Sequence, residues 1–154
     1  MKMPVMDQLH KDHINYSKLL DLLDSYLEEQ KAGSDKGYLE MYLIMNYMTR
    51  YPDIFHHPYE DIIFEEVIKL DDDFRDEIEN LEAEHTKLYE MSRSLLDDLD
   101  AVVNEHIVEK SKIQQAAAEY SSALRSHMDM EEARIFPGIN ERMTETAWNN
   151  IADK

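Results

Sequence analysis

The sequence of 154 residues has no cysteine and only three glycines and four prolines. Without cysteine the chain forms no disulfide, no thiolate zinc site and no iron–sulfur cluster, and it offers no thiol for catalysis. So few glycines and prolines leave few turn signals, which favours long helices. No run approaches the ~20 apolar residues that span a bilayer, and the N-terminus has no apolar signal region. We therefore expect a soluble, cytoplasmic protein that is mostly helical.

Positive charge is also scarce, because 16 Lys and Arg face 34 Asp and Glu and the formal net charge is −18. Such a surface repels the phosphates of nucleic acids and of anionic lipids. We therefore expect neither nucleic acid nor a membrane as a partner. Seven histidines accompany the carboxylates. This combination indicates either a metal site built from nitrogen and oxygen or an acidic surface with scattered histidines.

Apolar residues recur at helical spacing in four long segments. The first covers about 5–30 and ends at a turn over 32–37. The second covers about 38–70 and contains Pro52 and Pro58. Each of these prolines removes a backbone donor, so a kinked or two-piece helix is expected here.

A third helix over about 73–99 follows a run of three aspartates that would cap it. A less regular connection leads from there to the fourth helix, over about 109–136. Pro137 and Gly138 end or interrupt the fourth helix, and a short helix over 144–152 is expected after them.

Four long amphipathic helices joined by short links predict an all-α fold, an up-down-up-down four-helix bundle. The length suits one domain. We therefore expect a single domain over 1–154, with the bundle at about 5–137 and a C-terminal extension at 138–154.

One histidine lies in the apolar stripe of each predicted helix: His13, His56, His85 and His127. Two of them precede a carboxylate by four residues, which puts both groups on one helix face; these pairs are His56 with Glu60 and His127 with Glu131. At ~1.5 Å per residue, each helix and the return along the next cover similar lengths, so the four imidazoles are expected in one layer. Burying these groups without a metal would be costly.

The two halves of the chain repeat this pattern. His13 precedes His85 by 72 residues, and His56 precedes His127 by 71. A duplicated hairpin would relate the ligands by a pseudo-twofold axis, which suits two metals bridged by two carboxylates. Nitrogen and oxygen ligands fit iron, manganese or zinc, and paired sites of this kind in bundles typically hold iron or manganese. A hydrogen-bonded polar core without metal is the alternative.

The ordered motifs resemble those of the hemerythrin-like, HHE cation-binding family over about residues 5–137. They are Asp12-His13, Phe55-His56-His57-Pro58-Tyr59-Glu60-Asp61, Glu84-His85 and His127-Met128-Asp129-Met130-Glu131-Glu132, the last followed by Ile135-Phe136-Pro137. The resemblance implies two iron ions (Fe2+/Fe3+) joined by an oxo or hydroxo bridge. It also implies that two carboxylates bridge the ions and that four histidines complete the set: His13, His56, Glu60, His85, His127 and Glu131.

One departure from the family concerns Tyr89. Oxygen-carrying hemerythrins have a fifth histidine one turn after the third-helix histidine, and this chain has Tyr89 there. The four-histidine set resembles that of iron-centre repair proteins, but those proteins carry a cysteine in an N-terminal segment. Tyr89 follows His85 by four residues and so can reach the site. We take Tyr89 as the candidate catalytic residue. It could be a phenolate ligand, a hydrogen-bond donor to a bound oxygen species, or a residue that only packs in the core.

His57 is a second candidate at the same point of the chain. It repeats the four-residue spacing with Asp61 and competes with His56 as the ligand. The 71-residue repeat favours His56.

The resemblance implies a small diatomic or peroxide ligand, namely O2, NO or H2O2. We expect a di-iron protein that binds or reacts with such a ligand in sensing or in oxidative or nitrosative stress defence. The sequence leaves open whether the protein turns over NO or H2O2 as an enzyme and which protein partner it has. One alternative is iron storage, sensing or delivery to other proteins. Another is a structural bundle with zinc or no metal.

Overall fold

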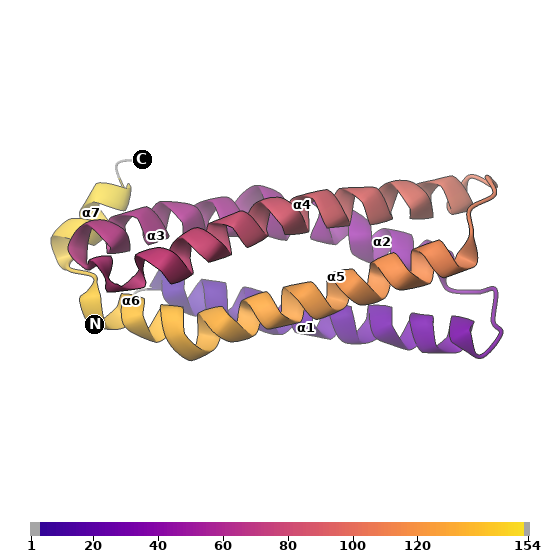
Figure 1. Cartoon of the computed structure of the whole chain (residues 1–154), viewed down its shortest axis with the longest axis horizontal. Coiled ribbons are helices and arrows are strands. Elements are labelled where there is room, and N and C mark those ends of the chain that lie inside the picture. The colour runs from indigo at the N-terminus through magenta and orange to yellow at the C-terminus, as the bar shows by residue number, and fades with distance from the viewer. Residues whose placement is uncertain (1–3, 153–154) are drawn as a thin grey trace.

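The computed structural model describes residues 4–152, and these residues form helices and turns without a β-strand. Four long helical segments run back and forth along one axis (Figure 1). They are α1 (Pro4–Lys31), α2 and α3 (Tyr38–Met48 and His57–Leu70), α4 (Arg75–Val103) and α5 (Lys110–Met130). Both α1 and α4 pack against α2 and α5, so the segments close into a bundle. The predicted all-α, hemerythrin-like bundle is confirmed.

The second segment is divided in two, as its prolines predict. Between α2 and α3 lies the π-helical turn η1 (Tyr51–His56), after which the His57 N–H donates to the Pro52 carbonyl five residues earlier. Pro58 has no N–H, and its ring would clash with the carbonyl four residues back, so the helix widens before it. Turns of this type occur frequently at functional sites.

The fourth segment widens in the same way but does not stop at its proline. The π-helical turn η3 (Glu131–Ile135) follows α5 and leads directly into α6 (Phe136–Arg142). Pro137 lies in the first turn of α6, where its missing N–H costs little. Gly138 is required there because an added Cβ would lie 2.7 Å from the Phe74 ring. Pro137 and Gly138 therefore interrupt the helix without ending it.

The ends of the remaining elements lie near the predicted ones. The side chain of Asp71 accepts a hydrogen bond from the Asp73 N–H and so caps the short 3-10 turn η2 (Asp72–Phe74) that precedes α4. The predicted terminal helix is α7 (Glu145–Ala152), which packs against α3. Among residues 4–152, no helix combines the length and the apolar character needed to cross a bilayer.

Two apolar clusters fill the bundle, one toward each end. The larger cluster lies toward the end of the bundle where α1 connects to α2 and α4 to α5, and it includes Leu23, Met41, Met45, Leu95 and Ile113. The smaller cluster lies toward the opposite end, where α1 begins and α7 packs, and it includes Leu9, Phe64, Ile78, Ile135 and Ile151. The histidines and glutamates of the motifs occupy the stretch between the two clusters, so the polar layer is sealed by apolar packing on both sides.

Candidate metal centre

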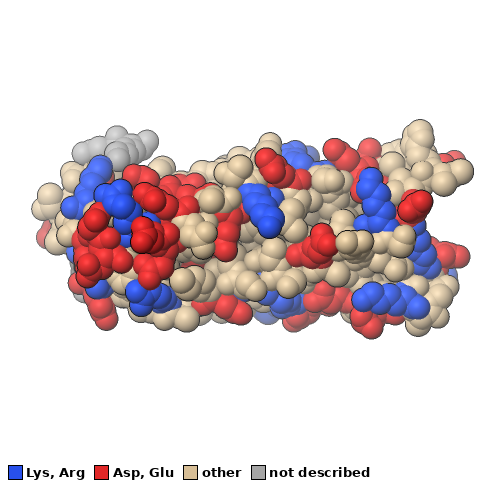
Figure 2. Space-filling view, viewed as in Figure 1, with Lys and Arg blue, Asp and Glu red and all other residues tan. Residues whose placement is uncertain are grey.

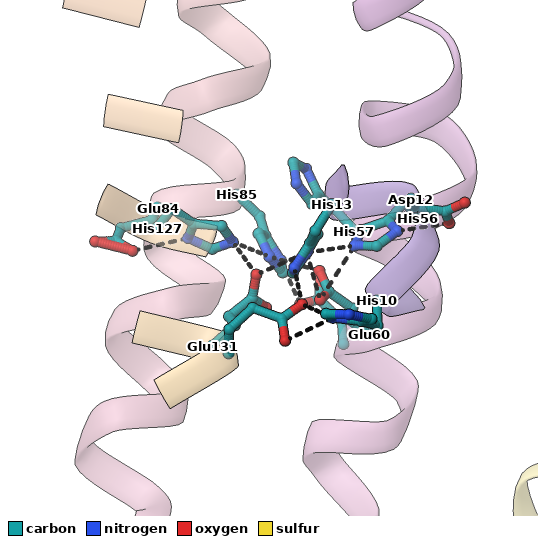
Figure 3. Close-up of polar contacts among 12 residues, drawn as sticks. His10, Asp12, His13, His56, His57, Glu60, Glu84, His85, His127 and Glu131 are labelled. Carbon is teal, nitrogen blue, oxygen red and sulfur yellow. Dashed lines mark hydrogen bonds and ion pairs between the residues drawn. The ribbon is translucent and has the colours of Figure 1, made fainter. Parts of the chain in front are cut away.

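The six residues predicted as ligands lie in one buried layer of the bundle (Figure 3). None of them is more than 6% exposed. Every long segment contributes: His13 from α1, His56 from η1, Glu60 from α3, His85 from α4, His127 from α5 and Glu131 from η3. The return of each helix to the same height brings them together, as the segment lengths predict.

The imidazoles face one another in two pairs. Nε2 of His13 lies 3.1 Å from Nε2 of His56, and Nε2 of His85 lies 3.0 Å from Nε2 of His127. Two ligands at right angles around a metal ion, each about 2.1 Å from it, would lie about 3 Å apart. Each pair therefore has the spacing of two nitrogen ligands on one cation.

Glu60 lies between the two imidazole pairs. Its Oε2 is 3.2 Å from Nε2 of His56 and 3.8 Å from Nε2 of His13. Its Oε1 is 3.4 Å from Nε2 of His85, which belongs to the other pair. The two oxygens of one carboxylate thus face different imidazole pairs, as those of a bridging ligand would.

Glu131 occupies the matching position on the opposite segment. Its Oε1 is 3.5 Å from Nε2 of His13 and 3.0 Å from Nε2 of His127. All four side-chain oxygens of Glu60 and Glu131 are buried, and none makes a hydrogen bond to a described residue. A buried carboxylate without hydrogen bonds is costly. A bound cation would remove that cost, so the donor set fits a metal.

Each of the four imidazoles also contacts a carboxylate through Nδ1, the ring nitrogen that faces away from the layer. The four contacts are His13–Glu132 at 2.9 Å, His56–Asp12 at 2.9 Å, His85–Asp61 at 2.7 Å and His127–Glu84 at 2.8 Å. When Nδ1–H donates to the carboxylate, the lone pair of Nε2 points into the layer. Metal-binding histidines are oriented by such outer carboxylates, which also raise their basicity.

The sequence paired Asp61 with His57, whereas the structure pairs it with His85, and no role was predicted for the other three outer acids, although a local signal exists. An acid directly precedes His13 and His85, and another directly follows Glu60 and Glu131. Neighbouring residues lie about 100° apart around a helix. The outer acids therefore face the adjacent helix, and only the packing of the bundle shows which imidazole each one reaches.

In the first imidazole pair, the surroundings shift the pKa values of the two rings in opposite directions. Burial lowers the pKa of His13. Burial also acts to lower the pKa of His56, but Glu60 and Asp12 outweigh it and raise that pKa to about 9. The acidic neighbours of His56 therefore favour its charged form, whereas burial favours the neutral form of His13.

The second pair shows the same pattern of opposite pKa shifts. Burial opposes protonation of His85, but Asp61 and Glu60 raise its pKa to about 9. Burial and the nearby His85 lower the pKa of His127 to about 4. Burial, followed by repulsion from Glu60, raises the pKa of Glu131. Two adjacent buried carboxylates thus disfavour each other's charged form in the metal-free layer.

His57 is brought into the layer together with His56. It is buried, and its ring stacks on that of His85, with centroids 4.2 Å apart and planes inclined by 11°. Its Nδ1 is 3.5 Å from Oδ1 of Asp53, a buried acid that accepts a hydrogen bond from Ser92. Two groups have ligand atoms within 4.8 Å of one another: His57, Glu60, His85 and His127, and His13, His56 and Glu60.

Tyr89, the predicted catalytic residue, lies at the surface of α4. Its side chain is 44% exposed, and the Arg93 guanidinium lies 5.1 Å from the ring centroid. Together with six other residues it lines a hollow of about 200 Å³: Asp53, His57, Pro58, Asp61, His85 and Thr86. Tyr89 therefore stands where solvent approaches the second imidazole pair, and its role in a reaction stays a prediction.

A family model described as the hemerythrin HHE cation binding domain matches residues 5–140. This span contains all six predicted ligands and the four outer acids. Comparison with curated proteins and with solved structures gave no match.

Proposed function

The chain belongs to the hemerythrin HHE cation-binding family, and from this and the geometry we propose that the buried layer binds two iron ions. Each ion would be held by one imidazole pair, with Glu60 and Glu131 bridging them. The observation that carries the proposal is the set of Nε2 distances, 3.1 Å and 3.0 Å, on either side of two carboxylates that lack hydrogen bonds. Donors of nitrogen and oxygen alone suit iron.

Two ferrous ions in this layer would supply electrons to O2, NO or a peroxide. The residues of the chain control access to that chemistry. The apolar clusters exclude water from both ends of the layer. The hollow beside Tyr89, about 200 Å³, leads to His57 and His85 and suits a ligand of only a few atoms. We propose that the phenol of Tyr89 donates a hydrogen bond to a ligand that enters there.

In the cell, this chemistry would serve to sense or remove oxygen, nitric oxide or peroxide under oxidative or nitrosative stress. The test is anaerobic reduction of the iron-loaded protein, followed by separate titrations with O2, NO and H2O2. We expect two irons per chain and, after oxidation in air, the near-ultraviolet band of an oxo bridge. Absence of both would refute the di-iron proposal. Continued consumption of NO or H2O2 would identify an enzyme, whereas a single stoichiometric reaction would identify a binding or sensing module.

The role of Tyr89 is tested by Tyr89→Phe, with Tyr51→Phe as a control at another exposed tyrosine of the chain. We expect an unchanged visible spectrum of the ferric protein and a slower reaction with peroxide in Tyr89→Phe alone. Loss of a visible charge-transfer band would instead identify Tyr89 as a phenolate ligand. Equal reaction rates in wild type and both variants would leave Tyr89 without a part in the reaction.

The acidic surface favours a second candidate function, the handling of iron itself. Figure 2 shows acidic side chains gathered on one face at the end of the bundle where α4 begins. With a net charge of −18, the surface attracts cations. Transfer of iron to an apo-acceptor faster than its spontaneous release would support storage or delivery. Metal analysis that finds zinc, or no metal, would favour a structural bundle.

A further inference from the structure

The outer face of the second helical segment carries a row of exposed apolar and aromatic side chains at four-residue intervals. The row, named here the α2 stripe, consists of Leu39, Leu43, Tyr47, Tyr51, Phe55 and Tyr59. Each of these residues is between 37% and 64% exposed. The ring centroids of Tyr47 and Tyr51 are 4.4 Å apart, and those of Tyr51 and Phe55 are 5.9 Å apart. The exposed Ile54 lies in the same segment.

The segment that carries the α2 stripe is nearly free of charge. Residues 38–59 contain only Glu40, Arg50 and Asp53 as charged residues, and Asp53 is buried. One arginine against two acids gives the segment a net charge of −1, so the rest of the chain carries −17 of the −18. The α2 stripe is therefore a neutral strip on a strongly acidic molecule.

The exposed apolar area of the α2 stripe with Ile54 is comparable to one side of a small protein–protein interface. An aromatic side chain has ~150–250 Å² of surface, so the four half-exposed aromatic side chains offer roughly 400 Å², to which Leu39, Leu43 and Ile54 add their exposed area. The largest apolar patch on a typical monomer is ~300–600 Å², and a stable interface buries ~800 Å² on each partner. At about 1.5 Å per residue, the stripe is about 30 Å long.

We propose that the α2 stripe pairs with the α2 stripe of a second copy of this chain in a twofold-symmetric dimer. Two molecules of charge −18 repel each other over most of their surfaces. The repulsion is weakest when residues 38–59 of one copy face residues 38–59 of the other. A row of side chains at four-residue spacing forms a ridge that fits between the same ridges of another helix. A twofold axis allows one surface to serve both partners. The dimer leaves the acidic faces outward and requires no bound metal.

Sedimentation of the full chain tests this dimer, from about 1 μM to about 1 mM protein. We expect a monomer–dimer equilibrium that strengthens as salt is raised, because salt screens the like charges and leaves the apolar contact intact. Leu43→Glu is expected to weaken association at least about tenfold. Leu22→Glu on α1 is the matched control, since Leu22 is 44% and Leu43 56% exposed. Circular dichroism verifies that both variants fold.

A wild type that stays monomeric throughout, or equal effects of Leu43→Glu and Leu22→Glu, would overturn the proposal. Single cysteines test the symmetry, because the chain has none of its own. A twofold axis passes near the middle of the α2 stripe, so Tyr51→Cys is expected to form a disulfide-linked dimer and Leu39→Cys is not. Linkage through Leu39→Cys alone would contradict this arrangement. The measurements use metal-free and iron-loaded protein, and failure to bind iron would leave the dimer prediction unchanged.

Discussion

The two halves of the metal layer share one plan and differ in what surrounds it. His13 and His56 form one pair, and His85 and His127 form the other, at nearly equal Nε2 distances of 3.1 Å and 3.0 Å. The outer acids repeat as well, since Asp12 holds His56 as Glu84 holds His127. Features present in both halves are those that a pair of cations needs. Features present in only one half distinguish the two cations from each other.

The first unrepeated feature is His57. At the 71-residue spacing its counterpart is Met128, a buried residue of the larger apolar cluster. The second imidazole pair therefore has a third imidazole within reach, stacked on His85. The same neighbour is missing from the group formed by His13, His56 and Glu60.

The second unrepeated feature concerns the outer acids themselves. Nδ1 of His10 lies 2.9 Å from both carboxylate oxygens of Glu132, so this acid has a second imidazole partner besides His13. At the 72-residue spacing the counterpart of His10 is Glu82. Glu82 is repelled by Asp61, the outer acid of its own half. One outer acid is therefore supported and the other is crowded.

The largest expected effect comes from removing an inner ligand. His56→Ala and His127→Ala should each abolish binding of at least one iron, and because the positions are equivalent their effects should be similar. A cation present at 100 times its dissociation constant stabilises the fold by about 2.7 kcal/mol, and this contribution should be lost. Iron analysis and thermal unfolding measure both effects. His106→Ala, in the exposed loop after α4, is the control. Full iron content in either variant would contradict the repeat.

The inner layer could be predicted from the sequence because its signals are local. A histidine in an apolar stripe with a carboxylate four residues later specifies a helix face, and similar helix lengths specify a common height.

Other features depend on contacts between helices and could not be predicted in this way. The partner of each outer acid lies on another segment. The α2 stripe was not found because α2 is apolar on both faces, so its periodicity does not show which face is buried. The π-helical turn η3 forms because the helix continues past Pro137 into α6. The sequence alone did not show whether the helix ends or continues at this proline.

The outer acids should give the next largest effect. Asp61→Asn and Glu132→Gln each remove the carboxylate behind one imidazole, and such changes typically lower metal affinity ~10–100-fold. We expect the smaller loss for Asp61→Asn, because it also relieves the repulsion with Glu82, whereas Glu132→Gln loses the contact with His10. Competition with a chelator measures both affinities. Asp76→Asn, on the exposed first turn of α4, is the control. Equal losses would show that the surroundings of the two acids do not matter, and the reverse order would contradict the roles given to Glu82 and His10.

His57 can be tested by making the halves alike. His57→Met gives this position the side chain found at its counterpart, Met128, and should lower the affinity for one of the two cations about tenfold or less. The affinity for the other cation should be unchanged. In a metal titration, one of the two dissociation constants should therefore change by that factor and the other should not. Met128→His makes the opposite change in the other half. A titration curve unaffected by His57→Met would show that this imidazole only packs against His85.

The smallest expected effect concerns the crowded acid. Burial, followed by Glu65 and Asp61, raises the pKa of Glu82 from 4.5 to about 7. Between these values the native state binds more protons than the unfolded state, so this group lowers stability as pH rises through that range.

Glu82→Gln should therefore raise the free energy of unfolding of the metal-free protein near pH 8 by no more than about 1 kcal/mol, since solvent still screens this half-buried group. The gain should fade below pH 4.5, where the carboxyl is neutral in both states. Urea unfolding across this range measures it. His10→Gln, at the counterpart position, should instead lower the free energy of unfolding, because it removes the contact with Glu132 and relieves no repulsion. Equal signs for the two variants would mean that the outer acids of the two halves have the same surroundings, which is what a perfect repeat requires.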